Sequence, residues 1–174
     1  VKVLYIQTER SIIEIIERLK VIRKTYPVQV DNILITDEYQ KLNLLNTTHA
    51  DIFLDCLKRD AQGVDVIILD PIYSTVGGGL SGDTAATMFT RIFNRVQKEL
   101  DCALYYNHHT IKPAYEMQDG KYTRMEKDDP FYGSQWLKAH VTGSYYMRSA
   151  DNGVIMTMKK DNYRLLAHKI VLEY

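Results

Sequence analysis

Apolar residues recur with two different periods in the first part of the chain. Residues 1–7 (VKVLYIQ) are mostly β-branched or aromatic, which is typical of a strand. After a cap at Thr8 or Ser11, an apolar helical face is predicted from Ile12, Ile15, Ile16, Leu19 and Ile22. Strands are predicted again at residues 32–36, 64–70 and 102–107, and helices at residues 48–60 and 83–100.

This order of elements predicts the fold class. Strands that alternate with helices are typical of a parallel sheet with helical crossover connections. The almost unbroken apolar run at residues 64–70 is typical of a strand buried on both faces. Three closing strands are predicted at residues 143–148, 153–160 and 165–172, the first two joined by a tight turn. We therefore predict one α/β domain over residues 1–174, with three layers, a mostly parallel sheet and antiparallel strands that extend it.

A long polar segment spans residues 111–130. It carries Lys112, Lys121, Arg124 and Lys127 beside five acidic residues, so its charges nearly balance. A short helix at about residues 133–140 is predicted after it. We interpret the segment as a flexible functional loop, because long connections within a compact domain often serve binding.

Composition narrows the classes of protein. Lys plus Arg and Asp plus Glu both total 22, so the formal net charge is zero, and any nucleic-acid binding must come from a local patch. Cys56 and Cys102 lack metal-binding spacing, which favours buried free thiols. No apolar run approaches the roughly 18 residues of a membrane span, and no signal peptide is visible. We therefore expect a cytoplasmic protein, in the host cytoplasm if it is viral.

The main candidate for chemistry is Asp70. It ends an apolar strand, and the carboxyl ends of parallel strands face the crevice where ligands bind. In a nucleotide-dependent enzyme this is the Walker-B position, where an aspartate holds Mg²⁺, usually through a water. A strand-terminal aspartate that caps the next element is the alternative.

Glu9 follows the first strand at the same edge of the predicted sheet. Two carboxylates at neighbouring strand ends can divide the work, one for the metal and one for the attacking water. The alternative is that Glu9 caps the following helix, since residues 8–11 (TERS) are typical of a helix start.

A histidine pair, His108 and His109, ends the strand at residues 102–107. A polar side chain there would sense the γ-phosphate of a nucleotide. One metal site for both is disfavoured, because neighbouring residues on a strand point to opposite faces. A surface histidine pair is the other interpretation.

Five segments in order resemble one known family: VLYIQTE, VIILDPIYSTVGGG, YYNHHTIK, GSQWLKAHVTGSYYMR and MTMKKDNYR. Their order and spacing resemble RecA-like ATPases of the DnaB type, especially replicative helicases and RepA-like ATPases of plasmids and phages. The resemblance covers essentially the whole chain. It implies a RecA-like core that assembles into a ring, expected to be a hexamer, and acts on DNA.

The resemblance also implies roles for the strand-end residues. Glu9 matches the family's catalytic glutamate, and Asp70 matches the Walker-B aspartate for Mg²⁺. His109 matches the residue that contacts the γ-phosphate of ATP, with His108 as its neighbour.

Other basic residues match more loosely. Lys160 and Arg164 match a pair that reaches the ATP of the neighbouring subunit as an arginine finger, although Arg164 comes later than the usual spacing. A solvated hairpin end is the alternative for both. The polar loop with Lys112, Lys121 and Arg124 is expected to contact single-stranded DNA.

One motif of the family is missing. The phosphate-binding loop, GxxxxGK[ST], cradles phosphates with backbone N–H groups and a lysine, and this sequence does not contain it. The stretch TVGGGLSGDT has no lysine and follows the Walker-B strand. We therefore expect a core that is incomplete at its N-terminus, and we favour a missing upstream segment over a degenerate relative.

These features predict an ATP-hydrolysing motor core, helicase-like or RepA-like, with ATP and Mg²⁺ as cofactors and with this segment inactive by itself. A non-catalytic RecA-like module, such as a helicase loader or recombination accessory protein, is the alternative. A metal nuclease built on Asp70, Glu9 and His109 is less favoured, because a two-metal site needs a denser acidic cluster.

Overall fold

The computed structural model describes residues 1–26, 31–76, 83–109, 114–118, 121–125, 139–163 and 169–173. The chain forms two compact units. The first comprises Val1–Thr110 with Phe131–Ser134, and the second comprises Ile111–Pro130 with Gln135–Tyr174. That residues 1–174 form one domain remains a prediction, which this division into two units does not test.

The first unit contains a four-stranded parallel sheet. Its strands are β1 (Val3–Gln7), β2 (Ile33–Thr36), β3 (Val66–Asp70) and β4 (Ala103–Tyr106). Their order in the sheet is β2-β1-β3-β4, and each neighbouring pair runs parallel. The parallel sheet predicted from the alternation of strands and helices is confirmed, and the α/β fold is a RecA-like core.

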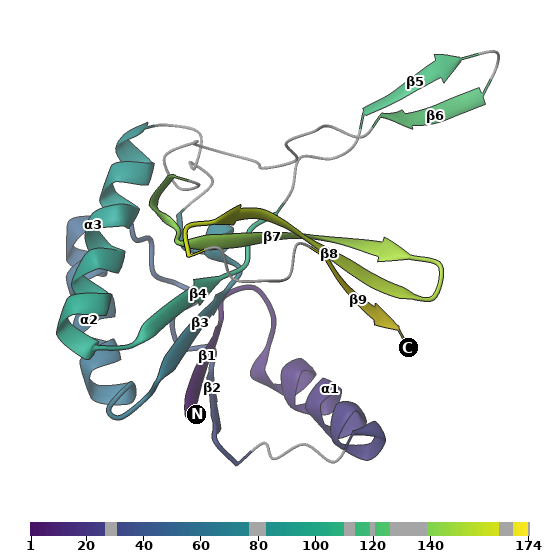
Figure 1. The fold of residues 1–174 in the computed structure, drawn as a ribbon. Coiled ribbons are helices and arrows are strands. Elements are labelled where there is room, and N and C mark those ends of the chain that lie inside the picture. The colour runs from purple at the N-terminus through teal and green to yellow at the C-terminus, as the bar shows by residue number, and fades with distance from the viewer. Residues whose placement is uncertain are drawn as a thin grey trace. The chain divides into compact units, whose positions relative to one another are not determined.

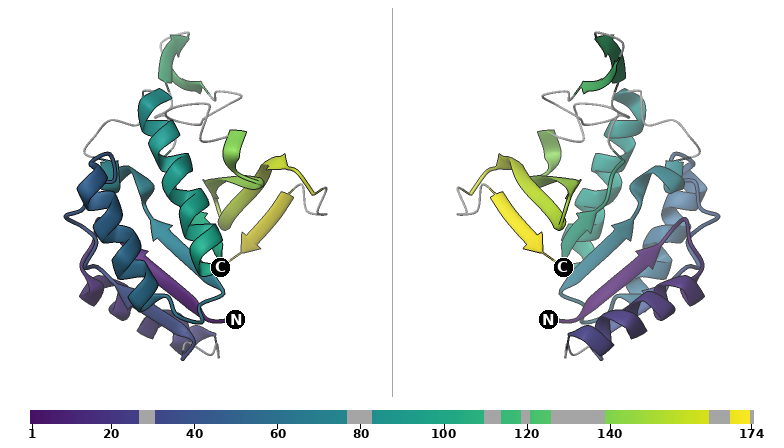
Figure 2. Two further views of the ribbon diagram at one scale, coloured as in Figure 1. Left: turned by 90° about the vertical axis from the view of Figure 1, so that its left-hand side faces the viewer. Right: turned by 90° about the vertical axis from the view of Figure 1, so that its right-hand side faces the viewer.

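Helices connect the strands and cover the sheet. They are α1 (Ile12–Thr25), α2 (Thr47–Asp60) and α3 (Asp83–Leu100), and a 3-10 helix η1 (Ile72–Val76) follows β3. Figures 1 and 2 show α2 and α3 on one face of the sheet and α1 on the other. This arrangement leaves the carboxyl ends of the strands open at one edge.

The core lies between the sheet and helices α2 and α3. Strand residues that alternate along the chain share one face, and four of them are almost fully buried: Leu4, Ile6, Ile67 and Leu69. The helices contribute Phe53, Leu57, Phe89 and Val96, each at most 2 % exposed. Burying one such side chain stabilises the fold by about 1.5–3 kcal/mol.

The apolar stripe of α1 packs less closely than its spacing predicts. Ile15 is buried, but Ile16 and Ile22 are 39 % and 45 % exposed. Helical periodicity reveals which side of a helix is apolar, and it does not reveal how much of that side the neighbouring elements cover.

Local chemistry sets the helix boundaries. The side chain of Ser11 accepts a hydrogen bond from the Glu14 N–H and caps α1, and Asn46 caps α2 through the His49 N–H. Beyond α2, Gly63 has a φ of 65°, a left-handed conformation that costs glycine little. The caps thus agree with the helix starts predicted from the sequence.

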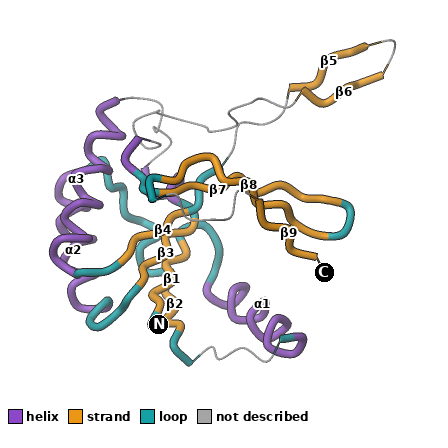
Figure 3. The backbone as a smooth tube through the Cα atoms, viewed as in Figure 1, coloured by secondary structure: helices purple, strands orange, loops and turns teal. Residues whose placement is uncertain are grey.

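The second unit contains antiparallel strands, drawn in orange in Figure 3. Strands β5 (Ala114–Gln118) and β6 (Lys121–Met125) pair with each other. Strands β7 (Gly143–Ala150), β8 (Gly153–Asp161) and β9 (Lys169–Glu173) form a three-stranded sheet. The predicted tight turn is confirmed, since Ala150 pairs with Gly153.

Two expectations about this unit are wrong. The segment at residues 111–130 was expected to be a flexible loop, but ten of its residues form the β5–β6 pair, whose antiparallel strands satisfy their own backbone groups. The closing strands were expected to extend the parallel sheet. In the described residues they instead take one another as hydrogen-bonding partners and form a separate sheet. Of the helix predicted at residues 133–140, the described part is 139–140.

Within the ranges that the structure describes, the helices are all too short or too polar to cross a lipid bilayer.

Candidate functional site

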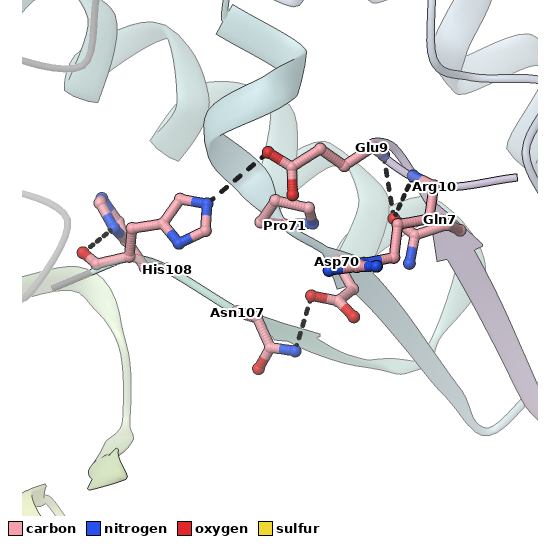
Figure 4. Close-up of a pocket in the computed structure, with 8 residues that line it drawn as sticks. Gln7, Glu9, Arg10, Asp70, Pro71, Asn107 and His108 are labelled. Atoms are coloured by element: carbon pink, nitrogen blue, oxygen red, sulfur yellow. Dashed lines mark hydrogen bonds and ion pairs between the residues drawn. The ribbon is translucent and has the colours of Figure 1, made fainter. Parts of the chain in front are cut away.

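A pocket lies at the carboxyl ends of β1, β3 and β4. Its cavity volume is about 230 Å³, and Figure 4 shows its lining side chains, which are Gln7, Glu9, Arg10, Asp70, Pro71, Asn107, His108 and His109. Ligand pockets commonly have volumes of about 300–1,000 Å³, so this one suits part of a ligand, such as its phosphate end. Parallel strands deliver their carboxyl ends to one edge of the sheet, which explains why these residues meet.

The strand register brings the segments that carry Glu9 and Asp70 together. Gln7 and Asp70 are partners in the register of β1 and β3. Beyond them, the Thr8 N–H donates a hydrogen bond to the Asp70 carbonyl over 2.9 Å. The Thr8 hydroxyl donates to the Pro71 carbonyl over 2.6 Å. These bonds fix the chain that leaves β1 against the chain that leaves β3.

Gln7 shapes the turn that presents Glu9. Its side chain is only 2 % exposed, and its Oε1 accepts hydrogen bonds from the N–H groups of Glu9 (2.9 Å) and Arg10 (3.2 Å). Glu9 does not cap α1, because Ser11 occupies that position. The Glu9 carboxylate is therefore available to the pocket.

The Asp70 carboxylate is held by side chains from both neighbouring strands. The Tyr5 hydroxyl donates to Oδ2, and Asn107 Nδ2 donates to Oδ1 over 2.8 Å. Burial and then the hydrogen bond to Asp70 raise the pKa of Tyr5, so its hydroxyl stays protonated at neutral pH. Among the described residues the partners of this carboxylate are side chains, so it is not a cap for η1.

The two histidines differ in their surroundings. His109 Nε2 lies 3.8 Å from Glu9 Oε1, and its ring meets that of Tyr73 edge to face at 6.1 Å. His108 Nδ1 lies 2.7 Å from the His109 carbonyl, and since a carbonyl only accepts, Nδ1 carries the hydrogen. Burial lowers the pKa of His108, which keeps this imidazole neutral at pH 7.

The oxygen donors of the pocket fit a hard cation that takes its other ligands from a bound substrate and from water. In the described part of the chain, no cluster of three or more His, Cys, Asp or Glu residues is arranged to hold a metal ion. Mg²⁺ is usually bound by one or two carboxylates, by waters and by substrate phosphates, and it needs no cage made of protein alone. Asp70 with Glu9 nearby meets that requirement.

Other predicted site residues are not brought into this pocket by the described structure. Lys160 lies near the end of β8 in the second unit, where its Nζ donates to the Ala139 carbonyl over 2.6 Å. Lys121 and Arg124 lie on β6. Lys112 and Arg164 fall outside the described residues.

Sequence reasoning missed four residues of the pocket, which are Gln7, Arg10, Pro71 and Asn107. Gln7 ends β1 as Asp70 ends β3, and Asn107 directly follows β4, so the reasoning that identified Asp70 applies equally to these two amides. Arg10 lines the pocket beside Glu9 and forms an ion pair with Glu14 at 3.2 Å. A basic residue directly after a candidate catalytic carboxylate was the available signal.

Comparison with known proteins identifies the fold of this region. A family model described as an AAA domain matches residues 1–114, which is 114 of the 174 residues and includes the whole pocket. A search of curated proteins found no match.

Proposed function

The chain belongs to the AAA domain family of nucleotide-binding ATPases, and we propose that its pocket binds the phosphates of ATP with Mg²⁺ and supports ATP hydrolysis. The observation that carries this proposal is the convergence of Glu9, Asp70 and His109 on one pocket at the carboxyl ends of parallel strands. Asp70 ends β3, and Glu9 and His109 follow β1 and β4. Their meeting provides a carboxylate for a metal, a carboxylate for a water and a donor for an anion.

In the proposed reaction Glu9 is the general base. Its carboxylate accepts a proton from the water that attacks the γ-phosphorus, a step that commonly contributes about 10²–10⁴-fold to the rate. The gap of 3.8 Å to His109 exceeds a hydrogen bond, so Glu9 keeps acceptor sites for that water. The turn fixed by Gln7 orients the carboxylate before substrate binds.

Asp70 and His109 are proposed to stabilise the negative charge of the ATP phosphates. Asp70 would hold Mg²⁺, which when bound neutralises charge on the phosphate oxygens. His109 would donate a hydrogen bond to the γ-phosphate, where negative charge accumulates during transfer. The neutral ring of His108 donates to the His109 carbonyl and so restrains the backbone that carries this group.

We further propose that the protein is a DNA-acting motor of the helicase-like or RepA-like type. The β5–β6 pair supports this, since its register sets Tyr115 opposite Arg124 and Met117 opposite Tyr122. These four positions alternate with the others and share one face of the ribbon. Aromatic and basic residues in such an arrangement suit a single strand, through base stacking and phosphate contacts.

The ring arrangement completes the proposal. ATP would lie between subunits of a ring, expected to be a hexamer in the cytoplasm, and Lys160 or Arg164 of one subunit would reach the ATP of the next. A basic group supplied in trans stabilises the charge of the transition state in many such enzymes.

ATP hydrolysis by the full-length gene product, measured with and without single-stranded DNA, tests the proposed function. We expect turnover that single-stranded DNA stimulates. Turnover without stimulation would contradict the DNA-acting role and leave the ATPase. ATP binding without turnover under either condition would contradict hydrolysis and favour the alternative, a non-catalytic RecA-like module that loads or assists another protein.

A further inference from the structure

The Asp70 carboxylate accepts one side-chain hydrogen bond on each oxygen. Tyr5 of β1 donates to Oδ2, and Asn107, directly after β4, donates to Oδ1 over 2.8 Å, the contact drawn in Figure 4. A carboxylate oxygen has two acceptor sites. Each oxygen of Asp70 therefore keeps one site for a ligand in the pocket.

The sheet register explains why Tyr5 reaches Asp70. Gln7 is the partner of Asp70, and Tyr5 stands two residues earlier on β1, opposite Ile68. Residues two apart on a strand point to the same face, so Tyr5 and Asp70 are diagonal neighbours. Diagonal neighbours lie about 7–8 Å apart, a span that an aromatic side chain crosses.

Asn107 is fixed by its backbone on both sides. Its N–H donates to the Leu69 carbonyl over 3.0 Å, and its carbonyl accepts from the Ile72 N–H over 3.0 Å. Its amide thus approaches Asp70 from a rigid position. The hydroxyl of Tyr5 supplies the second point that fixes the carboxylate plane.

Tyr105 on β4 occupies the matching position on the other side of β3. Ile68 pairs with Tyr5 in one direction and with Tyr105 in the other. Tyr105 therefore shares one face of the sheet with Ile68 and Asp70, and burial and then the charge of Asp70 raise the pKa of Tyr105. Of the two tyrosines, however, Tyr5 is the one that donates a hydrogen bond to Asp70 in the described structure.

We propose that Tyr5 is a positioning residue that holds the Asp70 carboxylate in the orientation that binds the divalent cation of a nucleotide. The inference rests on the proposed function, because that function assigns the cation to Asp70. Tyr5 acts only through Asp70 and contacts neither cation nor nucleotide. Without its hydroxyl, the carboxylate is fixed at Oδ1 alone and can turn about its terminal bond.

Cation affinity measures this role directly. Removal of a group that orients a metal ligand typically weakens metal binding about 10–100-fold. The Tyr5→Phe variant removes only the hydroxyl and keeps the ring. Tyr105→Phe makes the same chemical change at the matching position and is the control.

The experiment uses the full-length gene product, saturating ADP and Mn²⁺ as the probe, with free Mn²⁺ followed by electron paramagnetic resonance. We expect the Mn²⁺ dissociation constant to rise about tenfold or more in Tyr5→Phe and to stay within about twofold in Tyr105→Phe. Thermal unfolding of both variants checks that the fold is intact.

A second arm tests whether Tyr5 acts through Asp70. In an Asp70→Asn background, Tyr5→Phe should leave the remaining Mn²⁺ affinity unchanged, because the carboxylate it orients is gone. The same loss in both backgrounds would overturn the inference.

Two outcomes separate the inference from the function on which it rests. Equal Mn²⁺ affinities for Tyr5→Phe and Tyr105→Phe, in proteins that still bind ADP, would overturn the role of Tyr5 and leave the proposed function in place. A wild-type protein that binds no Mn²⁺ with ADP would overturn both.

Discussion

The carboxylate of Glu9 and the imidazole of His109 lie 3.8 Å apart, although they follow β1 and β4, which β3 separates in the sheet. The two side chains therefore meet at the carboxyl end of β3, the strand that carries Asp70. All three side chains line the same pocket. This arrangement brings the proposed base, the proposed metal ligand and the proposed hydrogen-bond donor to phosphate into one pocket, and it underlies the predictions below.

The turn that presents Glu9 depends on the Gln7 amide. Gln7→Met keeps the length of the side chain and removes the acceptor for the N–H groups of Glu9 and Arg10. We expect the free energy of unfolding to fall by about 1 kcal/mol, since a lost hydrogen bond commonly costs that amount. Chemical denaturation measures this change, and ATP turnover should fall with it. Gln62→Met, at an exposed position, is the control and should change neither quantity.

Stability should depend on pH through His108. Burial lowers the pKa of this imidazole below its ordinary value of 6.5, so the unfolded chain binds the proton more readily than the folded chain. The contribution of His108 to the free energy of unfolding is therefore constant well above pH 6.5. As the pH falls from there toward the pKa of His108 in the folded protein, stability decreases. His108→Asn should lose less stability than the wild type between pH 7.5 and pH 5.5, compared by denaturation at each pH. An identical pH dependence for wild type and His108→Asn would contradict this prediction.

The proposed contact with single-stranded DNA predicts a specific effect at β6. Arg124→Ala should weaken binding and reduce the slope of log affinity against log salt concentration by about 0.7, the value for one phosphate contact on a single strand. Fluorescence anisotropy with a labelled oligonucleotide at several salt concentrations measures both. Lys20→Ala on α1, an exposed lysine paired with Glu17, should leave the slope unchanged. A slope that does not differ between Arg124→Ala and the wild type would remove this residue from the interface.

Some of the fold and the site could be predicted because they depend on local pattern. An apolar strand followed by a polar residue identifies a strand end, and all strand ends of a parallel sheet meet at one edge. That reasoning identified Glu9, Asp70 and His109 from the sequence, and all three line the pocket. It did not reveal that Tyr5 reaches Asp70, because that contact depends on the exact register between β1 and β3. It also did not reveal that Gln7 fixes the turn, because that local contact depends on the conformation of the buried Gln7 side chain.

Non-local pairing explains the two errors in the second unit. The sequence pattern predicts that the segments at β7, β8 and β9 are strands. Which strands pair with one another depends on the partners available in the folded chain, and the pattern does not show this. Residues 114–125 alternate weakly between apolar and polar, so their pairing into β5 and β6 is not visible from hydropathy. A strand pair without clear alternation of apolar and polar residues leaves little trace in the sequence.

Glu9→Gln in the full-length gene product is the most direct test of the nucleotide pocket. The amide keeps the size of the side chain and cannot accept the proton of the attacking water. We predict that the rate constant for ATP hydrolysis falls by about 10²-fold or more, while the dissociation constant for ATP is unchanged. Glu17→Gln, an exposed glutamate on α1, should retain wild-type turnover. Undiminished turnover in Glu9→Gln would contradict the account.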